Sequence, residues 1–147
     1  MTIKIKKILE LYEAFASLDG YTEIKDGKVS EKTYYYFGGK TKYNLVKNLN
    51  VLKRHYENFE KTRDELVKSI SGGSDSIKAD EPEKLEKFNK ELVALLDTEE
   101  EVSGLLKVKF EALNLDDEKD KDGKIVRFGN KIPNTTISKI FDFVEAE

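Results

Sequence analysis

The residues best suited to chemistry lie between Lys32 and Tyr56. This stretch holds six positively charged residues and no acidic residue, and aromatic residues are interleaved with the cations. Cations contact phosphate groups and aromatic rings stack on bases, so the pattern indicates a face that could bind nucleic acid. The residues of this basic aromatic face (within 32–56) are Lys40, Lys42, Tyr43, Lys47, Lys53 and Arg54.

Two short acidic runs form a second set of candidates. A dense acidic surface can mimic nucleic acid toward a protein that normally binds it. The same acids could instead neutralise the basic face, if the 32–56 segment and residues 97–101 meet in a helical hairpin. The sequence leaves both interpretations open. The acidic patch candidates are Glu99, Glu100, Glu101, Asp116, Asp117 and Glu118.

Metal and nucleotide motifs are incomplete. Residues 118–125 resemble the front of an EF-hand loop, but the twelfth position, which should carry a bidentate carboxylate, is Gly129. Gly39-Lys40-Thr41 would suit the end of a P-loop, but Tyr34 stands where that motif needs a glycine. We therefore predict a hairpin turn and a helix start at these places, with no metal and no cofactor.

Catalysis is not expected. The chain has no cysteine, which excludes thiolate nucleophiles, disulfides and thiolate zinc sites. His55 is the only histidine, and its helix neighbours Arg54, Tyr56 and Glu57 supply no nucleophile for a triad. We predict a surface or packing role for His55 and a protein that is not an enzyme.

A long helix over 41–70 organises the predicted fold. Its apolar residues recur in steps of three and four, which is a heptad seam typical of a helix that packs on another helix. A helix of this length spans about 45 Å. The seam could pair within the chain or with a second copy across a two-fold axis. The seam residues are Leu45, Leu49, Leu52, Tyr56, Phe59, Leu66 and Ile70.

The remaining segments predict an α+β fold in a single domain, 1–147. A helix is expected over 3–18 and a β-hairpin with an aromatic segment over 21–37. A long antiparallel helical hairpin follows over 41–103, and a strand, a turn and a C-terminal helix over 104–147. Alternation predicts the strand within 105–112. Pro133-Asn134 would open the last helix, whose apolar face would consist of Ile137, Ile140, Phe141 and Val144. The small antiparallel β element is assigned to two Asp-Gly hairpins and this strand.

Composition sets the broad class. The 147 residues carry a net charge of −3, yet residues 1–70 are net basic and residues 71–147 net acidic. The two halves could face each other, or each could have a partner of its own. No apolar run is long enough to span a membrane, and the first residues lack the apolar core of a signal peptide. A soluble cytoplasmic protein is predicted.

Two stretches carry a resemblance. Lys42-Tyr43-Asn44-Leu45-Val46-Lys47-Asn48 and the run from Glu101 to Asn114 resemble small accessory proteins of tailed phages, over about half of the chain. The resemblance implies a viral or prophage context, a host or virion protein as partner, and a place in the host cytoplasm or the virion. It carries no catalytic residue. The expected function is non-enzymatic protein–protein interaction, either as a virion or assembly component or as a stoichiometric inhibitor of a host defence protein, such as an anti-CRISPR. The alternative is a nucleic-acid-binding module that uses the 32–56 face.

Overall fold

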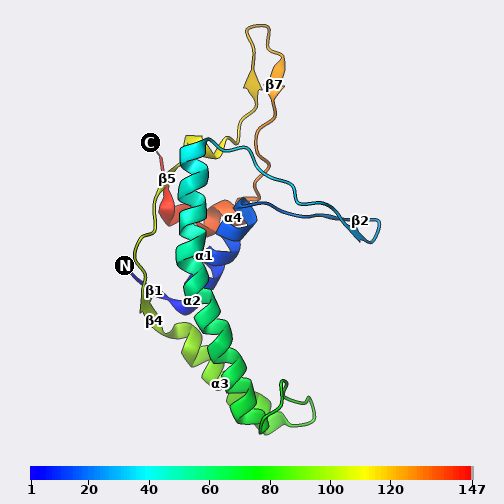
Figure 1. Ribbon diagram of the computed structural model, residues 1–147, viewed down its shortest axis with the longest axis vertical. Coiled ribbons are helices and arrows are strands. Elements are labelled where there is room, and N and C mark those ends of the chain that lie inside the picture. The colour runs from blue at the N-terminus through cyan, green and yellow to red at the C-terminus, as the bar shows by residue number, and fades with distance from the viewer. Residues whose placement is uncertain (147) are drawn as a thin grey trace. The chain divides into compact units, whose positions relative to one another are not determined.

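The computed structural model describes residues 1–146 and confirms the α+β class (Figure 1). The helices are α1 (Ile5–Leu18), α2 (Gly39–Ser71), α3 (Pro82–Asp97) and α4 (Asn134–Lys139), with short 3₁₀ turns at Phe110–Leu113 and Phe141–Phe143. The strands are β1 (Thr2–Lys4), β2 (Ile24–Lys25), β3 (Lys28–Val29), β4 (Glu99–Glu101), β5 (Val108–Lys109), β6 (Glu118–Lys119), β7 (Ile125–Arg127) and β8 (Val144–Glu145). Within the described residues, no helix has the length and apolar character that crossing a membrane requires.

The chain divides into two compact units. Unit 1 comprises Met1–Leu9 and Val51–Ser103, and unit 2 comprises Glu10–Asn50 and Gly104–Glu147. Helices α1 and α2 contribute residues to both units. The single domain expected from the sequence therefore stays a prediction.

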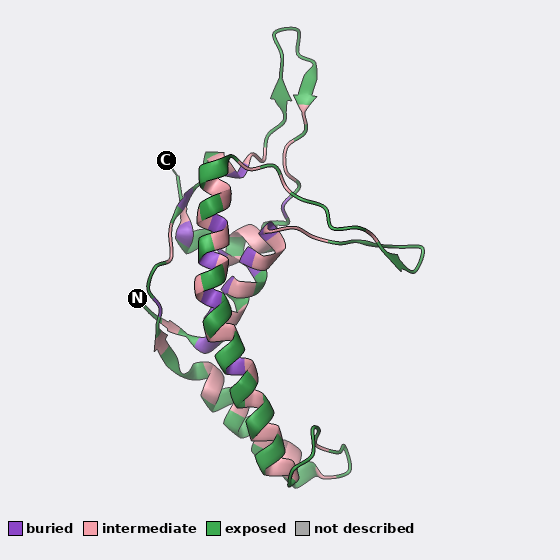
Figure 2. Ribbon diagram, viewed as in Figure 1, coloured by how far each residue is buried: buried purple, intermediate pink, exposed green. Residues whose placement is uncertain are grey.

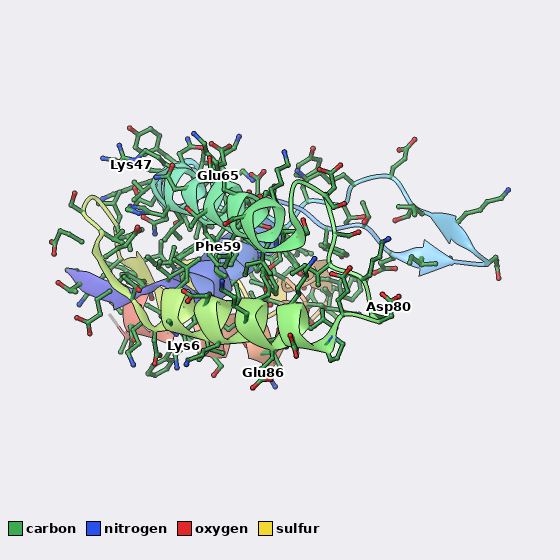
Figure 3. All side chains as sticks on the ribbon, turned by 90° about the horizontal axis from the view of Figure 1, so that it is seen from below. Lys6, Lys47, Phe59, Glu65, Asp80 and Glu86 are labelled. Atoms are coloured by element: carbon green, nitrogen blue, oxygen red, sulfur yellow. The ribbon has the colours of Figure 1, made fainter. Side chains whose placement is uncertain are left out.

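Unit 1 contains the predicted helical hairpin. The second part of α2 and α3 run antiparallel, and Phe59 lies between their ribbons (Figure 3). Phe59 is buried, whereas α3 has no fully buried residue. The apolar side of α3 lies along α2 and stays half-exposed. At the far end of α3, β4 pairs antiparallel with β1, and the Ile5 N–H donates to the Thr98 carbonyl at 2.9 Å.

Unit 2 holds the larger core. Leu11, Phe15 and Leu18 of α1 are buried, and the Phe15 ring meets Phe143 edge to face at 6.4 Å between centroids. Leu45 of α2 is buried as well. In Figure 2 the buried residues follow the helices, whereas the β2–β3 and β6–β7 hairpins are almost entirely exposed.

The heptad seam of α2 is covered in part by the chain itself. Leu45, Leu52 and Phe59 are buried, and the other four seam residues are half-buried. The helix begins two residues before the predicted start and ends one residue after the predicted end, which is within the usual uncertainty of helix boundaries.

Three predicted boundaries are wrong. The helical hairpin ends at Asp97, because residues 99–101 pair as β4 with β1. The strand expected over 105–112 is limited to β5, since the chain turns into a 3₁₀ helix that buries Leu113. The C-terminal helix stops at Lys139, because the chain then buries Phe143 and pairs β8 parallel with β5.

Candidate interaction surface

The start of α2 carries part of the predicted basic face. Lys40, Tyr43 and Lys47 follow the spacing i, i+3, i+7, which places them on one side of the helix. All three are exposed, Tyr43 to 66%, and Lys47 projects from α2 into solvent (Figure 3). Neither lysine forms an ion pair within residues 1–146. These three residues form an accessible basic stripe.

Lys42 lies off this stripe and belongs to an internal cluster. Its Nζ is 3.0 Å from Asp19 Oδ1, and Lys32 Nζ is 3.4 Å from Asp19 Oδ2. Both ammonium groups also lie over the Tyr34 ring, at 5.8 and 5.3 Å from its centroid. Burial raises the pKa of Asp19, but the hydrogen bonds and charges of Lys42 and Lys32 outweigh it, so the pKa of Asp19 lies below its ordinary value.

The other two basic candidates belong to unit 1. The Nζ of Lys53 is 3.9 Å from Oε1 of Glu57, which lies one turn further along α2. Arg54 is exposed. The structure thus divides the basic aromatic face predicted from the sequence. Unit 2 holds the accessible stripe and the Lys42 cluster, and unit 1 holds Lys53 and Arg54.

The first acidic run is largely engaged inside unit 1. The terminal ammonium of Met1 lies 2.6 Å from Glu101 Oε1, and the Thr2 hydroxyl donates to Glu101 Oε2 at 3.0 Å. The hydrogen bond from that ammonium, with the one from Thr2, holds the pKa of Glu101 below its usual range. Glu100 Oε2 lies 2.6 Å from Nδ1 of His55, whose side chain is 11% exposed. Glu99 is exposed.

The His55–Glu100 contact was not predicted. The two residues are 45 positions apart. The predicted helical hairpin would bring residues 97–101 near the 32–56 segment, but it did not identify this pair. A carboxylate orients an imidazole, but a triad also needs a nucleophile. The pair therefore does not by itself indicate catalysis.

The second acidic run stabilises the base of the β6–β7 hairpin. Asp117 Oδ1 accepts the Gly129 N–H at 2.7 Å, and Glu118 pairs with Arg127 at 3.0 Å. Asp116 is exposed. Two of the three carboxylates in this predicted patch are thus engaged by their own unit.

Asn130 fixes the aromatic segment of unit 2. Its Oδ1 accepts the Tyr36 N–H at 2.8 Å, and its Nδ2 donates to the carbonyls of Tyr36 at 2.7 Å and Leu113 at 2.8 Å. Asn114 Nδ2 donates to the same Tyr36 carbonyl at 3.0 Å. These bonds place the half-exposed Tyr36 ring 4.0 Å below the Arg127 guanidinium. Sequence reasoning missed both asparagines, because an asparagine in a loop has no periodic signal.

Both hairpins expose large apolar side chains. Ile24 and Val29 face each other across β2 and β3 and are 78% and 68% exposed. On and just after β7, Val126 and Phe128 are 65% and 69% exposed. They flank Arg127, which stacks on Tyr36. Tyr, Phe and Arg are enriched at protein interfaces, and exposed apolar residues that gather in one place mark such sites.

Within residues 1–146 no group of three or more histidine and acidic side chains is arranged to hold a metal ion. The EF-hand-like stretch forms the β6–β7 hairpin, in which Asp120 Oδ1 accepts the N–H groups of Asp122 and Lys124, both at 2.9 Å. Gly39-Lys40-Thr41 forms the first turn of α2. No protein-family model, curated protein or solved structure matches the chain.

Proposed function

We propose that this chain is a non-enzymatic protein-binding protein whose binding surface lies in unit 2. Two features of the β6–β7 hairpin carry the proposal: the exposed apolar side chains of Val126 and Phe128, and the Tyr36–Arg127 stack at the residue between them in the sequence. The few residues that dominate the binding energy at protein interfaces are enriched in Trp, Tyr and Arg.

The bonds that hold the Tyr36–Arg127 stack support the proposal. The side chain of Asn130 holds the Tyr36 backbone on both its N–H and its carbonyl, and Glu118 holds Arg127. A surface that is ordered before binding loses less conformational entropy when the partner docks. The Tyr36–Arg127 stack is therefore suited to be the anchor of the contact.

The proposed partner is a host or virion protein. In this proposal the chain is an accessory protein of a tailed phage, in the host cytoplasm or in the virion. It acts as a virion or assembly component, or as a stoichiometric inhibitor of a host defence protein such as an anti-CRISPR. Either role requires only a surface, which agrees with a site built from apolar and aromatic contacts.

The test is a quantitative pull-down from nuclease-treated bacterial lysate at high salt, with three baits. The wild-type chain and V93S should retain the same partner, because Val93 is 63% exposed but lies on α3 in unit 1. A V126S/F128S bait should lose that partner. Equal recovery by all three baits would refute the proposed surface.

A second candidate function, nucleic-acid binding, is favoured by the accessible stripe of Lys40, Tyr43 and Lys47. Contacts to phosphate should give an affinity that falls steeply with salt, and K40E/K47E should abolish it. Oligonucleotide binding that survives this double substitution would exclude the stripe as the site.

A further inference from the structure

We propose that a cavity of about 330 Å³ at the start of α2 binds a small phosphate-bearing ligand. This site is separate from the protein-binding surface described above. Its polar lining consists of Lys40, Thr41, Asn44, Lys107, Lys109 and Glu145, all of them in unit 2.

Two segments bring the cations together. Lys40 comes from the first turn of α2, and Lys107 and Lys109 come from the segment around β5. Val108 is buried, and side chains alternate along an extended chain, so Lys107 and Lys109 both lie on the solvent side of β5. The side chain of the buried Asn48 fixes this segment to α2 through the backbone of Leu106.

The charge of the lining indicates an anion. Three lysines line the cavity, and Glu145 is the one residue with a carboxylate side chain among its described lining residues. Lys40, Lys107 and Lys109 form no ion pair within residues 1–146, so their charges are available to a ligand. The Thr41 hydroxyl and the Asn44 amide add neutral donors, which suit the oxygens of a phosphate group.

The volume limits the size of the ligand. Small-molecule sites range from about 300 to 1,000 Å³, and this cavity lies at the lower end. It would hold pyrophosphate or a single nucleotide and would not enclose an oligonucleotide. The ligand could be a free phosphate compound or the terminal phosphate of a strand.

The experiment titrates the ¹⁵N-labelled full chain with pyrophosphate at low ionic strength. Saturable shifts are expected at the amides of Lys40, Thr41, Lys107 and Lys109. K107Q/K109Q should weaken binding roughly 100-fold, since two charge-assisted hydrogen bonds are lost and each is worth about ten-fold in affinity. K119Q/K121Q is the matched control, because it removes the same charge from the exposed β6–β7 hairpin and should leave binding unchanged.

A further variant changes affinity in the opposite direction. E145Q removes the one carboxylate among the described lining residues and should tighten pyrophosphate binding, which keeps the proposal testable even if the lysine variants fail to fold. The cavity would be refuted as the binding site if K107Q/K109Q and K119Q/K121Q weakened pyrophosphate binding equally, or if no saturable shift were seen.

Parallel titrations with AMP and with a twelve-residue oligothymidylate identify the source of the phosphate. Tighter binding of AMP than of the oligonucleotide, with shifts in the cavity, supports a free nucleotide. Oligonucleotide binding that shifts Lys40, Thr41, Lys107 and Lys109 supports the terminal phosphate of a strand. Shifts confined to Tyr43 and Lys47 would refute the cavity as the phosphate site and favour binding at the accessible stripe. Loss of phosphate binding leaves the protein partner unaffected, because neither Val126 nor Phe128 lines the cavity.

Discussion

Replacing Asn48 with alanine should destabilise unit 2 far more than its size suggests. Asn48 is fully buried, its Nδ2 donates to the Leu106 carbonyl at 2.8 Å, and its Oδ1 accepts the Leu106 N–H at 2.7 Å. Truncation removes both bonds and leaves two backbone groups of Leu106 without their partner. It also releases the segment that carries Lys107 and Lys109.

The magnitude follows from these groups. A buried backbone group left without its partner costs about 1–3 kcal/mol, and the two groups of the half-buried Leu106 lie toward the lower end of this range. Alanine favours the helix over asparagine by roughly 0.5 kcal/mol, which offsets part of the loss. The free energy of unfolding should therefore fall by about 2–4 kcal/mol. With a denaturant slope of about 2 kcal/mol/M, the urea midpoint should fall by about 1–2 M.

Urea unfolding followed by circular dichroism measures this change. N50A is the matched control, because Asn50 lies two residues further on the same helix and is exposed. Its midpoint should stay constant or rise slightly from helix propensity. Midpoints for N48A and N50A that agree within error would refute the assigned role of the Asn48 amide.

Two further predictions concern unit 2. D19N should lower the free energy of unfolding at pH 7. The pKa of Asp19 in the folded protein lies below its unfolded value of about 3.9. The stabilisation from the ionised carboxylate is therefore fully present above about pH 3.9 and is lost as the pH falls through the folded pKa. Urea midpoints for the variant and the wild type should converge near pH 2, and a constant difference would contradict the ion-pair cause. N130A should speed hydrogen exchange at the Tyr36 amide by at least ten-fold, because that N–H loses its acceptor. Unchanged exchange at Tyr36 would show that other contacts hold the segment.

The pairing of α2 with α3 was predictable, because a helix that is buried on one side repeats its apolar residues every three or four positions. The seam of α2 needs one dry side, and its steps of three and four appear in the letters. The apolar stripe of α3 repeats the pattern, so the antiparallel pairing followed. The β1–β4 and β5–β8 pairs were not predictable, because two or three residues per strand carry no periodic signal.

The candidate sites were less predictable, because the sequence shows which residues are charged but not which of them form ion pairs. Lys42 and Lys47 look equivalent in the sequence, yet Lys42 is held by Asp19 and Lys47 is accessible. Glu100 and Glu118 looked like surface acids, and each is paired with a residue of its own unit. Which charges remain available depends on tertiary contacts between distant segments.

Two turns share the same four-residue sequence but differ in backbone conformation, so the local sequence alone does not determine the turn. Lys25-Asp26-Gly27-Lys28 forms a tight hairpin in which Asp26 and Gly27 both have positive φ, 52° and 75°. In the stretch Lys121-Asp122-Gly123-Lys124, only Gly123 has a positive φ, at 80°.

The residue that precedes each turn explains the difference. The carboxylate of Asp120 accepts two backbone N–H groups and so supports a longer loop, whereas Ile24 at the matching position has no acceptor in its side chain. The longer loop leads into a register shift between β6 and β7, and such an irregularity redirects the side chains beside it. We therefore infer that Asp120, more than the Asp-Gly pair, sets how this hairpin orients the exposed side chains of Val126 and Phe128.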